Sequence, residues 1–217
     1  VGFSDITALH SLLSLHGVAS LHANMCKDLS LLPDEDIALS AEREFFMADT
    51  IPSPLSFTSH LLPLTYHPSP HHANVPYTIH HTSSSPLNRG GEVVGKLIGG
   101  NLSVLYGLQG TPYSLNKIIE QCEQPPILFI EDISENHYHI DRMLNSLRMS
   151  AVFDSIGGLV VGQFTDCADD PSMGCSLLES IRQVVDDYSF PILFDYPSGH
   201  IDSNYPLLLS ADYLLSV

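Results

Sequence analysis

The chain has 217 residues, of which 44% are hydrophobic and 8% aromatic, enough to bury a sizeable core in one large or two small domains. Its formal net charge is −17, from 8 Lys or Arg against 25 Asp or Glu, so we expect neither nucleic-acid nor membrane partners. No apolar run approaches the ~20 residues that span a bilayer, and the four cysteines lack CxxC spacing, which favours free thiols over disulfides or zinc.

The first ten residues are typical of a strand end, a tight turn and a helix start. The turn is Gly-Phe-Ser, ending at Ser4, and apolar residues recur at helical spacing over residues 5–15. A serine on a strand-to-helix turn is exposed where a nucleophile is needed. The alternative is that Ser4 is only the N-cap of the helix, a position that serine favours. Because the chain starts at Val1, within an apparent strand, we expect a further N-terminal region before it.

Two more elements precede a change in composition. We expect a strand over residues 18–25 and an acidic helix over residues 33–50. Residues 51–91 are rich in proline and histidine, and proline at this density excludes long helices. This segment is predicted to be a linker or insertion with a few extended pieces. It separates residues 1–50 from a domain over residues 92–217.

The histidines of this segment raise the question of a metal site. His67 and His71 are four residues apart, as two ligands on one helix would be. Pro68 and Pro70 lie between them, and no helix holds that spacing there. Solvated loop histidines are therefore the favoured interpretation, and no metal is predicted.

From residue 92 onward strands alternate with helices, which predicts an α/β domain with a mixed, at least partly parallel sheet. The expected strands are 92–100, 127–130, 159–161 and 191–194, the expected helices are 102–108, 137–149 and 176–187, and one or two closing strands follow near 207–209 and 213–215. The runs 127–130, 159–161 and 191–194 are continuously apolar, as strands buried on both faces would be.

The first of these strands ends in Gly99-Gly100-Asn101, with Asn101 capping the next helix. Glycines that open a helix can form an anion-binding turn, which would make Gly100 and Asn101 substrate-binding residues. A pair of glycines is a weak signal, and ordinary tight-turn chemistry is the alternative.

Three polar residues follow apolar runs and suit a catalytic triad: Ser4, Glu131 and His200. Their order along the chain matches nucleophile, orienting acid and base in α/β-hydrolase-type enzymes. His200 would take the proton of Ser4, Glu131 would hold the imidazole tautomer, and the backbone N–H of Asp5 would serve the oxyanion hole. Asp132 is an equally good acid on chemistry alone, and each residue also has an ordinary structural explanation.

The same residues carry a family resemblance in four motifs that follow one another along the chain. The motifs are residues 2–9, residues 99–103 with 110–113, residues 128–132 with 138–142, and residues 197–200. Together they resemble the LD-carboxypeptidases, serine peptidases of murein recycling that are related to the microcin-immunity peptidases. The resemblance covers nearly all of the chain outside residues 51–91.

The resemblance implies Ser4 as nucleophile, Glu131 rather than Asp132 as acid, and His200 as base. It implies a cytoplasmic enzyme, without metal or other cofactor, that releases terminal D-alanine from murein tetrapeptides, and it suggests a homodimer. Family members carry an upstream portion with a Gly-rich loop that supplies a second oxyanion donor. Residues 1–50 would then be the remainder of an N-terminal nucleophile-elbow α/β domain, followed by a C-terminal α/β domain with a mixed sheet.

Two alternatives stay open. The first is a microcin-immunity-like peptidase that cleaves aminoacyl-nucleotides; that branch, by resemblance, stacks the base on a tryptophan, and this chain has none. The second is a non-catalytic fragment or binding module, because the Gly-rich loop does not occur in this sequence. A reading frame that extends upstream through such a loop would favour the enzyme.

Overall fold

The computed structural model describes residues 1–47, 77–80 and 85–217 of the chain. His67, His71 and most of the predicted 51–91 linker lie outside these residues. None of the helices in the described ranges combines the length and apolar character that a bilayer span requires.

Six strands form one mixed sheet in the order β2-β8-β3-β4-β5-β6. The strands are β2 (Tyr77–His80), β3 (Glu92–Asn101), β4 (Ile127–Ile133), β5 (Gly158–Thr165), β6 (Ile192–Leu193) and β8 (Asp212–Ser216). Strands β3 to β6 run parallel, whereas β8 is antiparallel to β3, so the predicted mixed α/β sheet is confirmed. Parallel neighbours align their carboxyl ends at one edge, where sites of open α/β sheets lie.

A second, two-stranded sheet joins the beginning and the end of the chain. Strand β1 (Ser20–His22) pairs antiparallel with β7 (Leu207–Leu209). An isolated parallel bridge connects Gly2 to His22. The N-terminal turn is therefore attached to β1.

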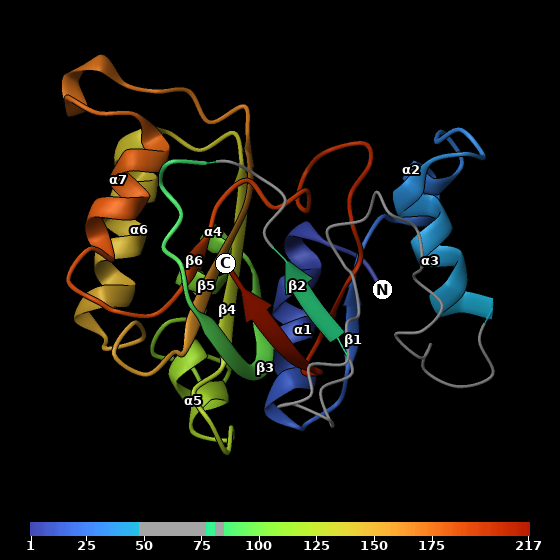
Figure 1. Cartoon of the computed structure of the whole chain (residues 1–217), viewed down its shortest axis with the longest axis horizontal. Helices are drawn as coiled ribbons and strands as arrows, with labels where there is room; N and C mark the ends of the chain where they lie inside the picture. Colours follow the sequence, from blue (N-terminus) through green and yellow to red (C-terminus); the bar gives the residue numbers. More distant parts are fainter. Residues whose placement is uncertain (48–76, 81–84) are drawn as a thin grey trace.

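Helices α4 to α7 cover one face of the main sheet (Figure 1). The two-stranded sheet of β1 and β7, together with α3, packs on the other face. The helical segments are η1 (Ser4–Ile6), α1 (Thr7–Leu15), α2 (Cys26–Leu29), α3 (Ile37–Met47), α4 (Leu102–Gly107), α5 (Leu115–Ile119), α6 (His137–Met149), η3 (Pro171–Met173) and α7 (Leu177–Val184). Ile130 of β4 faces the core under α4 to α7, whereas Phe129 faces the core under β1 and β7. Consecutive β4 side chains thus enter different cores, as strand geometry requires.

The expected elements are found with shifted ends. Helix α6 occupies the predicted range 137–149, because its apolar residues Ile140, Met143, Leu144 and Leu147 are all buried. The short α2 and α5 were not predicted, since four or five residues carry too little periodicity. Strand β2 lies inside the predicted linker and pairs with β8 at the sheet edge. The three-part domain division itself stays a prediction.

The capping hypothesis for Ser4 is wrong. The N-cap of η1 is Phe3 and that of α1 is Ile6, and neither helix start has a side-chain cap hydrogen bond. Ser4 is instead the first residue of η1, with a left-handed φ of 61°. Its hydroxyl is therefore not used to cap the helix that follows.

Candidate active site

Glu131 and His200 meet at the carboxyl end of β4. The Nδ1 atom of His200 lies 2.7 Å from Oε2 of Glu131, whose side chain is fully buried. The pairing of β4 with β5 shifts register between Ile130 and Asp132, and such a bulge re-aims the side chain it contains. Two of the three predicted triad residues are thus in direct contact.

Asp132, the neighbouring carboxylate, serves a different part of the fold. It accepts hydrogen bonds from Asn101 Nδ2, the Ser103 N–H and the Ile133 N–H, each at 2.9 Å. Because side chains alternate along a strand, Asp132 lies on the face of α4 while Glu131 lies on the opposite face. Of the two carboxylates that the residue chemistry left open, Glu131 is the one bonded to His200.

Two glycines allow the loop after β6 to press against Glu131. Gly199 has a φ of 137°, and a Cβ there would lie 3.2 Å from Glu131 Oε2. At Gly162 of β5 a Cβ would lie 2.4 Å from the Ser198 carbonyl oxygen. Larger residues at either position would push His200 away from the carboxylate.

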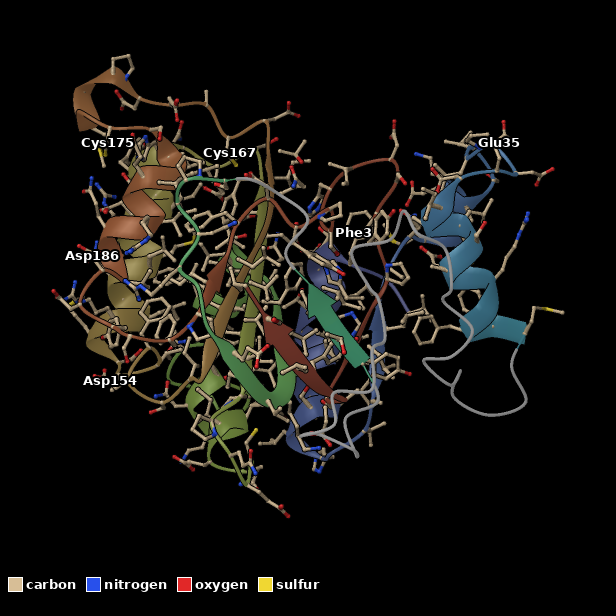
Figure 2. The ribbon with its side chains drawn as sticks, in the orientation of Figure 1. Phe3, Glu35, Asp154, Cys167, Cys175 and Asp186 are labelled. Carbon is tan, nitrogen blue, oxygen red and sulfur yellow. The ribbon has the colours of Figure 1, made fainter. Side chains whose placement is uncertain are left out.

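The turn that carries Ser4 lies against the imidazole of His200. Phe3 packs edge-on against the His200 ring, with centroids 4.7 Å apart. Ser4 follows with its positive φ, which is uncommon for a residue with a Cβ and is characteristic of strained functional turns. Figure 2 shows Phe3 near the middle of the molecule, whereas Asp154, Cys175 and Asp186 lie at its periphery.

Backbone and imidazole contacts fix the residue before this turn. The Gly2 N–H donates to the Leu21 carbonyl at 3.0 Å. The Gly2 carbonyl accepts a hydrogen bond from Nε2 of the buried His10 at 2.9 Å, and Nδ1 of His10 contacts Ser20 Oγ at 2.8 Å. Helix α1 and strand β1 therefore hold the turn from two sides.

The remaining predicted site residues lie around the same helix start. Asp5 is exposed in the first turn of η1, where helix N–H groups have no intrahelical partner. Asn101 caps α4 as predicted, accepting from the Val104 N–H at 3.2 Å, and its own N–H donates to Thr7 Oγ1 at 3.0 Å. Gly100 has a φ of 137°, and a Cβ there would lie 2.5 Å from Thr7 Oγ1. Their roles in binding substrate stay predictions.

The electrostatics of the pair favour the ionised form of Glu131. Burial on its own raises the pKa of Glu131, but the imidazoles of His200 and His22 outweigh it and hold that pKa below its usual value. A carboxylate only accepts hydrogen bonds, so Nδ1 of His200 is the donor, and in the neutral form of the ring the free lone pair is on Nε2. Such an imidazole can take a proton from a hydroxyl.

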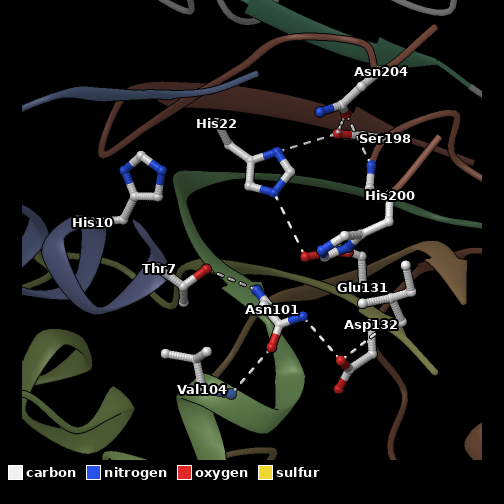
Figure 3. Close-up of polar contacts among 12 residues, drawn as sticks. Thr7, His10, His22, Asn101, Val104, Glu131, Asp132, Ser198, His200 and Asn204 are labelled. Atoms are coloured by element: carbon white, nitrogen blue, oxygen red, sulfur yellow. Dashed lines mark hydrogen bonds and ion pairs between the residues drawn. The ribbon is translucent and has the colours of Figure 1, made fainter. Parts of the chain in front are cut away.

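His22 is a site residue to which the sequence analysis assigned no role. It is fully buried at the end of β1, with Nε2 3.8 Å from Glu131 Oε1 and Nδ1 3.4 Å from Ser198 Oγ (Figure 3). The available signal was a histidine inside the strand predicted over residues 18–25. Only the fold shows that this strand lies over Glu131.

Comparisons with known proteins agree with this fold. A family model described as the LD-carboxypeptidase C-terminal domain matches residues 94–215. The chain is 30% identical over 216 residues to a probable murein peptide carboxypeptidase of Bacillus subtilis, covering 97% of this chain and 57% of that protein. It is also 30% identical over 204 residues to the murein tetrapeptide carboxypeptidase of Pseudomonas aeruginosa, covering 92% and 57%. The chain thus spans a little over half the length of these relatives.

Solved structures support the same conclusion for the fold. The muramoyltetrapeptide carboxypeptidase of Oxalobacter formigenes superposes with a TM-score of 0.70 at 24% identity, covering 100% of this chain and 64% of that one. The microcin C7 self-immunity protein MccF superposes with a TM-score of 0.68 at 21% identity, covering 97% and 62%. These matches define the class of fold as the mixed α/β fold that both structures share. Within that class, the chain belongs to the LD-carboxypeptidase family.

Proposed function

We propose that the protein is a serine LD-carboxypeptidase that releases the terminal D-alanine from peptidoglycan-derived tetrapeptides, with Ser4, Glu131 and His200 as its catalytic triad. The observation that carries this proposal is the 2.7 Å hydrogen bond between His200 and the buried Glu131, beside the turn of Ser4. The names of the relatives support the substrate class. The proposal includes a role in murein recycling in the cytoplasm and, from the family resemblance, a homodimer.

The proposed chemistry is acyl transfer through an acyl-enzyme. Nε2 of His200 takes the Ser4 hydroxyl proton as Oγ attacks the carbonyl carbon of the diamino acid. The N–H of Asp5 donates to the oxyanion that develops, and Glu131 stabilises the imidazolium. His200 then passes the proton to the D-alanine nitrogen as the C–N bond breaks. Water, deprotonated by His200, hydrolyses the ester and restores Ser4.

Removing the hydroxyl of Ser4 tests the proposal directly. The protein translated from its full reading frame is incubated with a tetrapeptide ending in D-alanine, and released D-alanine is measured. We expect Ser4→Ala to lower kcat by ~10⁴–10⁶-fold, the range for loss of a catalytic-triad residue. Ser155→Ala is the control, because Ser155 is exposed and follows Asp154, which lies well away from Phe3 in Figure 2. No release by the unmutated protein would refute the proposal.

The second candidate is cleavage of an aminoacyl-nucleotide. It is favoured by the 29% identity over 120 residues to the microcin C7 self-immunity protein MccF of Escherichia coli, which covers 54% of this chain and 32% of that protein. The absence of tryptophan from this chain counts against stacking of a base. Faster hydrolysis of an aminoacyl-sulfamoyl adenosine than of the tetrapeptide would favour this function. If neither substrate is cleaved, the non-catalytic alternative stands.

A further inference from the structure

One buried histidine outside the triad lies between Glu131 and the loop of His200, and its backbone is paired with the residue two before Ser4. His22 is fully buried on β1, and its backbone bridges to Gly2, two residues before Ser4. Its Nε2 faces Oε1 of Glu131 at 3.8 Å, and its Nδ1 lies 3.4 Å from Oγ of Ser198, on the loop that carries His200. Figure 3 shows the ring between these two partners.

Within the described residues, neither Oε1 of Glu131 nor Nε2 of His22 has another hydrogen-bond partner. Both atoms are buried, and leaving a buried polar atom without a partner is unfavourable, because its hydration is lost and not replaced. A carboxylate oxygen accepts only, so the group that satisfies it must be a donor, and Nε2–H of His22 is positioned to be that donor. Catalytic hydrogen bonds are often long without substrate and tighten once it binds.

The other side of the His22 ring is held in place. Ser198 Oγ lies 2.9 Å from the Tyr205 carbonyl and 3.0 Å from Asn204 Oδ1, which also accepts from the Gly199 N–H at 2.9 Å. The loop before His200 is thus tied together at the point where it meets Nδ1 of His22. Phe129 packs edge-on against the imidazole, with centroids 5.0 Å apart. These contacts leave Nε2 directed at Glu131.

A metal site is the other arrangement in which two histidines flank a carboxylate. In the described part of the chain, no group of three His, Cys, Asp or Glu side chains is arranged to hold a metal ion. His22 and His200 instead approach different oxygens of Glu131, at 3.8 and 2.7 Å. In this geometry the Glu131 carboxylate lies between the two imidazoles, with one oxygen facing each of them.

We infer that His22 is a positioning residue: it holds Oε1 of Glu131 and the Ser198 loop together, so that Oε2 is presented to His200 in one fixed orientation. This inference deepens the proposed function and rests on it for its kinetic consequences. The effect on the His200–Glu131 hydrogen bond does not require turnover. The positioning role of His22 and the proposed peptidase function can therefore be refuted independently.

The test replaces His22 with leucine, which removes the donor, and with glutamine, which keeps an N–H donor. In the protein from the full reading frame, His22→Leu is expected to lower kcat for tetrapeptide cleavage ~10–10²-fold with KM nearly unchanged, the loss that follows misplacement of a catalytic group. His22→Gln is expected to recover most of that loss. His137→Gln is the matched control, because His137 is also buried but contacts Ser180 on α7.

The second readout is the NMR signal of the His200 Nδ1–H proton, which is shifted downfield by its bond to Glu131. We expect this signal to be lost or broadened in His22→Leu and retained in His22→Gln and His137→Gln. If His22→Leu does not fold, Ser198→Ala frees Nδ1 and should weaken the same signal. An unchanged signal in a folded His22→Leu or Ser198→Ala protein overturns the inference. A lost signal in a protein that cleaves no tetrapeptide would uphold it while refuting the proposed function.

Discussion

At the scale of single residues, the two adjacent carboxylates of β4 have separate tasks. Glu131 accepts from His200 on one face of the sheet, and Asp132 accepts from Asn101 and the Ser103 N–H on the other. The sequence places both at a strand end but cannot show which one meets His200, because that depends on the bulge and on the loop after β6. The resemblance to a family chose Glu131, and the contact with His200 agrees with that choice.

Amide substitutions separate these two tasks. Glu131→Gln is expected to lower kcat by ~10⁴-fold, since an amide no longer fixes the His200 tautomer. Asp132→Asn is expected to cost about 1–3 kcal/mol of the free energy of unfolding, because an amide NH₂ would face a buried donor, with a smaller loss of kcat. Tetrapeptide turnover and thermal unfolding of both variants measure the difference. If Asp132→Asn lowers kcat more than Glu131→Gln does, Asp132 is the catalytic acid and Glu131 has the structural role.

Ser4 shows a different limit of the sequence at this scale. Its position before a helix suggested an N-cap, because serine is common there. The cap is instead Phe3, and the Ser4 backbone has a φ of 61°. Local propensity favoured the cap, whereas the attachment of Gly2 to β1 and His10 sets the actual turn. That attachment joins residues whose proximity exists only in the folded chain.

At the scale of elements, sequence patterns predicted the long segments and missed the short ones. Helix α6 is set by its buried face, and α7 begins at a capping box in which Ser176 Oγ accepts from the Glu179 N–H. Helix α5 and strand β2 are too short for a periodic signal, and β2 exists because it pairs with β8. Short elements of this kind are selected by tertiary contacts rather than by propensity.

Helix α1, which follows the Ser4 turn, packs against β3 and contacts Asn101, the residue that donates to Asp132 of β4. This contact depends on Thr7 Oγ1, which accepts the buried Asn101 N–H at 3.0 Å. We expect Thr7→Val to lower the free energy of unfolding by about 1–3 kcal/mol, because that N–H loses its acceptor. Thr7→Ser keeps the hydroxyl and should lose no more than about 1 kcal/mol. Denaturant unfolding measures both, and equal stability of the two variants would contradict the role of this hydrogen bond.

At the scale of the whole molecule, two buried groups make the stability depend on pH in opposite directions. Burial lowers the pKa of His10 from 6.5 to about 4. The unfolded chain takes up this proton first, so stability falls as the pH drops through that window. Burial raises the pKa of Glu42 from 4.5 to about 7. Here the folded chain holds the proton longer, so stability falls as the pH rises from about 4.5 to 7.

Between about pH 4.5 and 6.5, His10 makes the free energy of unfolding rise with pH and Glu42 makes it fall. The variant Glu42→Gln removes the contribution of Glu42 and should leave that of His10. Glutamine keeps an oxygen for the Asn24 N–H, which donates to Glu42 Oε1 at 2.9 Å, and it carries no ionisable proton. We expect this variant to match the unmutated protein near pH 4 and to exceed its free energy of unfolding at pH 8 by up to ~3 kcal/mol, the equivalent of the pKa shift.

The control for this prediction is Glu35→Gln, which removes the same formal charge from an exposed position in a protein of net charge −17. If the gain at pH 8 came only from reduced self-repulsion, both variants would be stabilised equally. If it comes from the cost of ionising a buried carboxyl, Glu42→Gln alone gains. Urea unfolding at pH 4, 6 and 8 distinguishes the two, and a Glu42→Gln protein no more stable than the unmutated one at pH 8 would show that Glu42 ionises in the folded state without penalty.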